Sequence, residues 1–239
     1  MKHLILDCGG VLVYPRLGDW QLPFGIVEVL GRRAQDIHSS RYLLAQRQAA
    51  HWLDESRLVG NVEEERQLRR EYLREIDVRM DWHMTFQEIE RLTDDFTDNI
   101  RRYGLFDDVD PWLKRWQQRY SLGILSDAMP SILVFLRRFG ILERFDAAVI
   151  STQVGAIKPD ARMYAAILKA LKAEPGDCLF VDDKAENLDG AVDAGMQAVQ
   201  MARPAFLPAV RWDGPSVRGF EELNTFMERQ EARLDPVSR

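Results

Sequence analysis

Short apolar runs and amphipathic stretches alternate along this chain of 239 residues. Five of the apolar runs lack the strict apolar–polar alternation of half-buried strands, which is typical of parallel strands covered on both faces. These runs lie at residues 3–7, 122–126, 147–151, 178–183 and 197–201. We interpret them as the buried strands of one parallel sheet.

Helical patterns separate the later strands. Asp110 and Pro111 are expected to open the first helix, with Asp as its N-cap and Pro in its first turn. Three further helices are expected over residues 130–139, 159–172 and 185–194. Strands that alternate with helices predict an α/β fold built on a doubly wound, Rossmann-like parallel sheet.

The interval between the first two strands is too long for a simple crossover, and its apolar residues repeat at helical spacing. Helix starts are expected at Thr85 with Glu88, at Asn61 with Glu64, and at Ser39 or Ser40. The apolar stripes place Leu44 and Phe86 in the core of a helical bundle. We therefore expect residues 15–104 to form an inserted all-helical cap domain, and residues 1–14 and 105–239 to form the α/β core.

Composition narrows the class of protein. Apolar residues make up 46% of the chain and the net charge is -6, which does not favour general nucleic-acid binding. No apolar stretch is long enough to span a bilayer. The two cysteines, Cys8 and Cys178, are interpreted as buried reduced thiols, with Cys8 pointing away from its neighbour Asp7 because strand side chains alternate. We expect a cytoplasmic protein without nucleic-acid or membrane partners; the oligomeric state is left open.

Polar side chains stand at the carboxyl ends of four of the predicted strands. In an open parallel sheet, ligands bind outside these ends, so the side chains are expected to meet in one crevice. The residues are Asp7, Ser126 with Asp127, Lys158, and Asp182 with Asp183. The alternative for Asp127 is that it caps the following helix.

This set of side chains suits the chemistry of phosphate esters. Asp7 and Asp183 can share a hard divalent cation, and Mg²⁺ prefers such oxygen ligands when phosphate supplies another. Lys158 and the Ser126 hydroxyl can hold the remaining phosphoryl oxygens. A carboxylate such as Asp7 is an accepted nucleophile, which forms an aspartyl-phosphate. The glycines after Asp7 allow the backbone to approach a ligand closely.

Four segments, in this order, resemble the four motifs of the haloacid dehalogenase superfamily: LILDCGGVLV, GILSDA, GAIKPDARMY and LFVDDKAENLDGAVDAG. The resemblance covers the whole core, and the predicted cap lies where first-position helical caps of the family lie. It implies that Asp7 is the nucleophile and a metal ligand, with the carbonyl of Gly9 as a second ligand. Asp183 is implied as the direct ligand from the fourth motif.

The resemblance also implies supporting roles. Asp182 acts on the metal through water, and Asn187 orients Lys158 and the acidic pair. Ser126 and Lys158 bind phosphate. Gly10 and Asp127 complete the predicted set of supporting residues around the phosphate. The family resemblance thus predicts a Mg²⁺-dependent hydrolase, of the phosphatase-like branch, acting on a small phosphorylated molecule.

One position departs from the family pattern. Phosphatases of this superfamily usually carry a second Asp two residues after the nucleophile, and this chain has Gly9 there. General acid and base catalysis is worth on the order of 10²–10⁴-fold, so the loss matters. Three interpretations follow: a phosphatase for good leaving groups or with a substitute acid, a catalytically impaired protein that binds a phosphorylated ligand or partner, and another reaction of the superfamily.

Overall fold

Six strands form one fully parallel sheet in the computed structural model, which describes residues 1–234. Their spatial order is β5 (Ala147–Ile150), β4 (Ser121–Ser126), β1 (His3–Leu6), β6 (Cys178–Asp182), β7 (Gln197–Met201) and β8 (Ser216–Val217). The five predicted strands are confirmed, and within this sheet only the two-residue β8 was not expected. Residues 235–239, the end of the predicted core, lie outside the described part.

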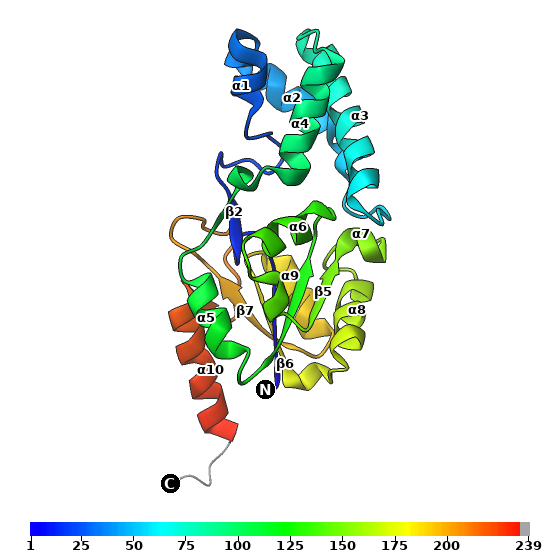
Figure 1. Cartoon of the computed structure of the whole chain (residues 1–239). Coiled ribbons are helices and arrows are strands. Elements are labelled where there is room, and N and C mark those ends of the chain that lie inside the picture. Colours follow the sequence, from blue (N-terminus) through cyan, green and yellow to red (C-terminus); the bar gives the residue numbers. More distant parts are fainter. Residues whose placement is uncertain (235–239) are drawn as a thin grey trace.

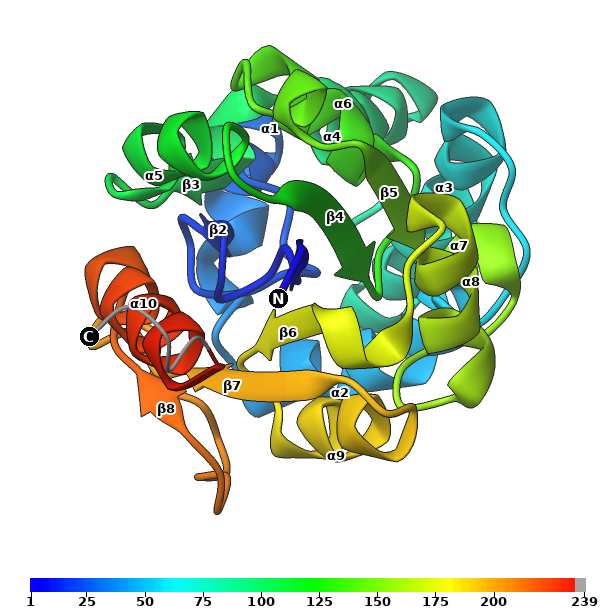
Figure 2. The ribbon, with the colours of Figure 1, turned by 90° about the horizontal axis from the view of Figure 1, so that it is seen from below.

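Helices cover both faces of the sheet, as Figure 2 shows from below. On one face, α5 (Val109–Trp116), α6 (Ser131–Arg138) and α10 (Phe220–Leu234) pack with Leu4 and Leu6 of β1. On the other, α8 (Ala161–Leu171) and α9 (Ala185–Asp193) pack with Ile5. Both faces of β1 are therefore buried in apolar clusters, which explains why its sequence does not alternate.

The predicted start of α5 is wrong by two residues. The N-cap position is Asp108, and no side chain caps the helix. The Asp110 carboxylate instead pairs with Lys114 at 2.7 Å and Arg144 at 2.6 Å. Two cations on the outside of the helix outcompete the backbone N–H groups for this carboxylate.

A helical layer formed by residues 26–98 sits above the sheet (Figure 1). It contains α1 (Ile26–Leu30), α2 (Ser40–Ala49), α3 (Val62–Met80) and α4 (Phe86–Asp98). The predicted starts are confirmed: the side chains of Ser39, Asn61 and Thr85 accept hydrogen bonds from the first turns, and Thr85 with Glu88 completes a capping box. These caps stabilise helix starts by roughly 0.5–2 kcal/mol each.

Two side chains expected inside this layer are exposed. Phe86 is 69% and Leu44 is 55% accessible to solvent. Phe86 is the first residue of α4, at the outer end of the packed stripe. Leu44 lies beside the inner face of α2, which buries Tyr42, Ala45 and Ala49 instead.

The chain leaves and re-enters the core through a small second sheet. Here β2 (Val13–Pro15) pairs in antiparallel register with β3 (Tyr103–Leu105). The predicted limits of the insert, at residues 15 and 104, fall inside this pair of strands.

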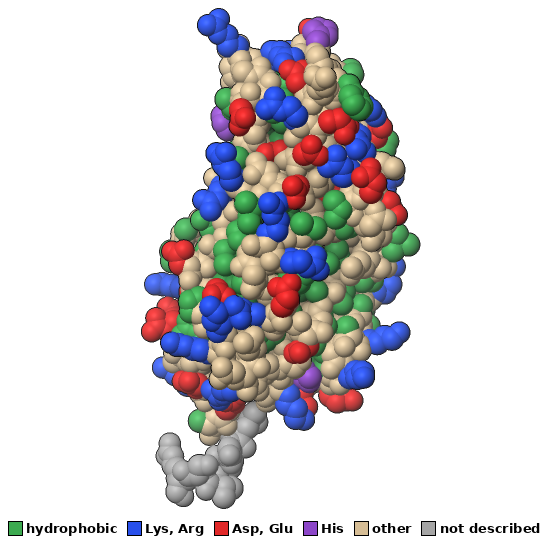
Figure 3. Space-filling model, in the orientation of Figure 1, with side chains coloured by type: hydrophobic (Ala, Val, Ile, Leu, Met, Phe, Trp, Pro, Cys, Tyr) green, Lys and Arg blue, Asp and Glu red, His purple; other side chains and the backbone are tan. Residues whose placement is uncertain are grey.

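Lys, Arg, Asp and Glu side chains are interspersed on the face of the molecule in Figure 3. Among the described residues, no helix is long and apolar enough to cross a membrane.

A buried carboxylate clasps the helical layer to the core. Glu65 of α3 is fully buried and accepts hydrogen bonds from the backbone N–H of Ser131 at 2.8 Å and from its hydroxyl at 2.9 Å. Arg69, one turn later, donates to the same carboxylate at 3.1 and 3.2 Å. We call these two hydrogen bonds between Glu65 and Ser131 the Glu65–Ser131 clasp. The clasp joins α3 to the start of α6, and the Glu65 carboxylate also neutralises the buried guanidinium of Arg69.

The clasp predicts a large stability effect. We expect Glu65→Ala to lower the free energy of unfolding by about 3–5 kcal/mol, because it leaves the Arg69 charge buried without a partner. Chemical denaturation measures the effect. The matched control is Glu71→Ala, which removes an exposed pair with Arg74 and is expected to cost less than about 1 kcal/mol. Equal losses in the two variants would contradict the role given to the clasp.

Candidate active site

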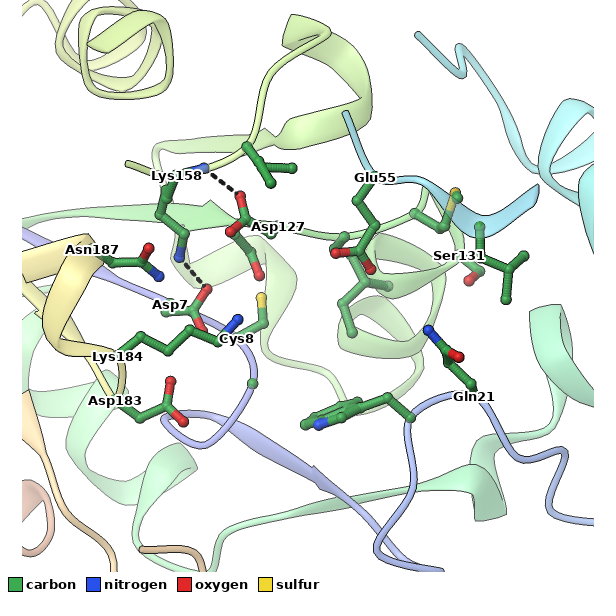
Figure 4. A pocket seen from close by; sticks show the side chains of 18 of the residues that line it. Asp7, Cys8, Gln21, Glu55, Asp127, Ser131, Lys158, Asp183, Lys184 and Asn187 are labelled. Carbon is green, nitrogen blue, oxygen red and sulfur yellow. Dashed lines mark hydrogen bonds and ion pairs between the residues drawn. The ribbon is translucent and has the colours of Figure 1, made fainter. Parts of the chain in front are cut away.

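A cavity of about 360 Å³ lies between the carboxyl ends of the strands and the helical layer. Figure 4 shows several of its polar side chains turned toward one another. The loops after β1, β4 and β6 contribute Asp7, Asp127 and Asp183, while the helical layer contributes Glu55 and Arg69. The strand-end residues predicted to meet in one crevice do come together here.

Lys158 stands at the centre of the cluster and is only 4% exposed. Its ammonium donates to Asp7 Oδ1 at 2.8 Å, to Asp182 Oδ2 at 2.6 Å and to the Leu125 carbonyl at 3.1 Å. Burial alone would lower the pKa of this ammonium. The adjacent Asp182, Asp7 and Asp127 outweigh burial and hold the pKa well above its usual value. Lys158 therefore stays charged and bridges the ends of three strands.

Asp182 and Asn187 hold Lys158 in place. Both oxygens of the fully buried Asp182 accept hydrogen bonds from the Asn187 amide, at 3.1 and 3.0 Å. The backbone N–H of Lys184 donates to the same carboxylate at 2.8 Å. With Lys158 included, both oxygens of Asp182 are engaged by protein donors.

Asp183 differs from its neighbour because its carboxylate accepts no hydrogen bond from the described residues. Burial raises the pKa of Asp183 to about 7, and the charges of Asp7 and Asp182 add to this effect. Burial likewise raises the pKa of Asp7 to about 6, even though Lys158 opposes the shift. One buried and one partly buried carboxyl group that disfavour their own charge in this way suit a site for a cation.

The residues around these carboxyl groups fit a hard divalent cation. Asp7, Asp182 and Asp183 each offer an oxygen, and these oxygens lie within 4.8 Å of one another. Within the described chain, the Gly9 carbonyl accepts no hydrogen bond. Gly10 has φ +69°, and a Cβ there would lie 2.8 Å from Asp183 Oδ2. Glycine is thus required at this position by both backbone conformation and the space that Asp183 occupies.

An aromatic ring occupies the place of the missing second Asp. A Cβ added at Gly9 would lie 3.3 Å from the Trp20 ring and 3.8 Å from Asp7 Oδ2. The backbone of Gly9 lies outside the left-handed region, so its conformation allows a side chain. Trp20 itself packs on Tyr103 and Phe206. No carboxylate can enter at Gly9 unless the indole shifts.

Ser126 and Asp127 stand at the carboxyl end of β4, which ends at Ser126. Ser126 lines the cavity, as expected. Asp127 does not cap the next helix, because its carboxylate accepts the backbone N–H of Lys158 at 2.9 Å. Cys8 also lines the cavity instead of pointing away from it, since β1 ends at Leu6 and the alternation ends with the strand. Burial raises the pKa of this thiol far above its usual value.

Several residues of the cavity were not recognised in the sequence, among them Trp20, Glu55, Arg69 and Lys184. Lys184 follows the acidic pair directly, and this adjacency was the one available signal. Burial and the neighbouring Asp127 raise the pKa of Glu55 to about 7. Trp20, Glu55 and Arg69 lie within residues 15–104, where nothing in the local pattern links them to strand ends far away in the sequence.

Comparison with known proteins agrees with this geometry. The chain shares 35% identity over 107 residues with the enolase-phosphatase E1 of Sorangium cellulosum, which covers 43% of this chain and 46% of that protein. It shares 35% identity over 103 residues with a phosphatase of Mycobacterium tuberculosis, or 41% of this chain and 46% of the relative. The matches span less than half the length of these relatives.

Solved structures share the fold over nearly the whole chain. A phosphatase from Thermococcus onnurineus superposes with a TM-score of 0.62 at 21% identity, covering 95% of this chain and 98% of that one. An L-2-haloacid dehalogenase from Xanthobacter autotrophicus gives a TM-score of 0.66 at 16% identity, with coverage of 95% and 98%. At these identities the likeness establishes the fold alone.

The family assignment rests on a longer match. Residues 1–195 match the family described as haloacid dehalogenase-like hydrolase, which is most of the described chain and includes Asp7, Ser126, Lys158 and Asp183. This chain therefore belongs to the haloacid dehalogenase-like hydrolases.

Proposed function

We propose that this hydrolase is a phosphatase that acts on a small phosphorylated molecule through an aspartyl-phosphate on Asp7. The proposal rests on how the two oxygens of the Asp7 carboxylate are hydrogen-bonded. Its Oδ1 is held by the Lys158 ammonium at 2.8 Å, whereas Oδ2 has no hydrogen-bond partner among the described residues. A carboxylate fixed by one oxygen presents the other as a nucleophile.

The surrounding side chains suit a phosphoryl group. Lys158 and the Ser126 hydroxyl are the proposed donors to its oxygens, and the exposed Lys184 adds positive charge at the mouth of the cavity. Fixed donors of this kind stabilise charge that develops in the transition state. A cavity of about 360 Å³ suits a small molecule. The phosphatase names of the two sequence relatives point the same way.

Mg²⁺ is the proposed cofactor, with Asp7, the Gly9 carbonyl and Asp183 as its ligands. When bound, the cation supplies charge that offsets the repulsion between a carboxylate and a phosphate ester. Asp182 is proposed to act on it indirectly, since both of its oxygens already accept hydrogen bonds from Lys158, Asn187 and the Lys184 backbone.

We further propose that the helical layer is a cap domain. In this division residues 15–104 form the cap, and residues 1–14 and 105–239 form the core. A cap over the cavity excludes water from the aspartyl-phosphate site. The pair β2–β3 is the proposed connection between the two domains, because the chain crosses there in both directions.

A second function is favoured by one observation, the indole that fills the space beside Gly9. A pocket without the usual acid suits a protein that binds a phosphorylated ligand or partner and turns it over slowly or not at all. The two candidates differ in whether the wild type turns over phosphate esters at an appreciable rate.

The nucleophile is tested directly by turnover of a panel of aryl and alkyl phosphates in the presence of Mg²⁺. We expect hydrolysis by the wild type and a loss of about 10⁴-fold or more in Asp7→Asn, because an amide is not a nucleophile for phosphorus. Acid quenching followed by peptide mass measurement should find the phosphate on Asp7. Binding of inorganic phosphate without any turnover in the wild type would favour the second function.

The metal site is tested by calorimetric titration with Mg²⁺. Asp183→Asn is expected to weaken Mg²⁺ binding by at least about 10-fold, because it replaces an anionic ligand by a neutral amide. Glu186→Gln removes the same charge from an exposed side chain at the start of α9 and is the matched control. The proposed ligand set is wrong if both variants bind Mg²⁺ as tightly as the wild type.

A further inference from the structure

Phosphoryl transfer to Asp7 leaves one requirement that Gly9 cannot meet. The departing oxygen of an alkyl ester needs a proton, and the attacking and leaving oxygens lie roughly in line on opposite sides of phosphorus. The leaving oxygen therefore faces away from Asp7, across the cavity and toward the helical layer. An acid that replaces the missing Asp has to stand on that side.

Glu55 stands on that side of the cavity. It belongs to the loop between the 3₁₀ turn Ala50–Leu53 and α3, and Figure 4 shows its carboxyl group turned into the cavity. The loop is held against the core. The N–H of Val59 donates to the Thr152 carbonyl at 2.9 Å, and the Glu65–Ser131 clasp follows six residues later. The segment that follows Glu55 is thus hydrogen-bonded to the core at two points.

The other acids of the cavity are already engaged. Asp127 accepts the backbone N–H of Lys158 at 2.9 Å. Asp54 accepts both the backbone N–H and the hydroxyl of Ser56, at 2.9 and 2.6 Å. Asp183 stands beside Asp7 on the core side of the cavity. Glu55 accepts no hydrogen bond from the described residues, so its carboxyl group is free to exchange a proton.

Histidine does not fill the role. His51 is the histidine nearest in sequence to this loop, and its side chain is 58% exposed. It lies at 5.0 Å from the Trp52 ring, and its Nδ1 is 2.9 Å from the Gln48 carbonyl. It is not among the residues that line the cavity.

We infer that Glu55 is the general acid and general base of this hydrolase, in place of the second Asp that Gly9 lacks. The inference rests on the proposed phosphatase function and assigns a catalytic residue to it.

The assigned steps balance as follows. Asp7 Oδ2 forms a bond to phosphorus while the bond from phosphorus to the leaving oxygen breaks and its electron pair stays on that oxygen. The carboxyl proton of Glu55 passes to this oxygen, which releases the alcohol and a Glu55 carboxylate. Glu55 then takes a proton from water, whose oxygen bonds to phosphorus. The bond to Asp7 breaks and its electron pair returns to the carboxylate, giving inorganic phosphate and restoring both side chains.

The electrostatic surroundings of Glu55 suit both steps. Burial is the main cause that raises the pKa of Glu55 to about 7, and the charges of Asp127 and Asp7 add to it. Arg69 of α3 and Lys184 oppose the shift. An acid whose pKa lies near neutral pH can give up its proton in the first step and take one in the second.

The test compares nitrophenyl phosphate, a good leaving group, with phenylethyl phosphate, an alkyl ester of similar size. Glu55→Gln is expected to lower kcat/KM for the alkyl ester by about 10²-fold or more and for the aryl ester by less than about 10-fold. Loss of the base should also make phospho-Asp7 accumulate in the variant. In the wild type, kcat/KM for the alkyl ester should fall as pH rises through about 7, and Glu55→Gln should lose this fall.

Two variants complete the design. Glu71→Gln removes the same charge from a partly exposed side chain of α3 that pairs with Arg74, and it should behave as the wild type. Glu55→Asp keeps the acid and should recover part of the alkyl-ester rate. If Glu55→Gln depends on the leaving group no more than the wild type, the role of Glu55 is wrong while Asp7-dependent turnover still supports the phosphatase. If neither the wild type nor any variant shows turnover that depends on Asp7, the proposed phosphatase function is wrong, and so is the role assigned to Glu55.

Discussion

The rest of the site depends on the ion pairs of one buried ammonium group, that of Lys158. It lies between Asp7 and Asp182, at 2.8 and 2.6 Å, and also binds the Leu125 carbonyl. Three strands that enter the site from different parts of the chain are joined by one charge. A buried charge is costly unless it is paired and fully hydrogen-bonded. Two carboxylates beside it meet that condition for the ammonium, and Asn187 completes the bonding of Asp182.

The arrangement leaves the site with an excess of negative charge. Lys158 offsets part of the charge of Asp7 and Asp182, but Asp183 stands without a partner among the described residues. Burial is the main cause that raises the pKa values of Asp7 and Asp183, and the neighbouring carboxylates add to it. In the function proposed above, the Asp7 carboxylate approaches an anionic phosphate ester, and a bound cation reduces the repulsion between them. The geometry of the core alone therefore argues for a cation as part of the working site.

Local patterns in the sequence were sufficient for most of the fold. The five strands are short apolar runs because both faces of the sheet are buried, and helix starts such as Asn61 and Thr85 carry their caps within a few residues. Burial within a helix was harder to predict, as the exposed Phe86 and Leu44 show. Which side of a helix is covered depends on the elements packed against it, and the sequence of the helix alone says little about those elements.

The core side of the site was equally predictable, because parallel strands bring their carboxyl ends together. Asp7, Lys158 and Asp183 meet for that reason. The opposite wall was not predictable. Glu55 lies in a polar loop where an acid looks like any surface residue, and Trp20 looks like ordinary core. Their positions follow from how the helical layer docks on the sheet, which is decided by contacts such as Glu65 with Ser131.

The docking contacts and the assigned acid lie on one continuous segment of the chain. Glu55 faces the cavity, Val59 bonds the backbone at Thr152, and Glu65 bonds the start of α6, all within eleven residues of sequence. A movement of the helical layer away from the core breaks the last two contacts and withdraws Glu55 together with them. With the acid on the core, as in a second Asp at position nine, protonation of the leaving group is independent of the cap. With Glu55 as the acid, as we propose, proton transfer to the leaving group requires that the helical layer is docked on the core, so docking and proton transfer are coupled.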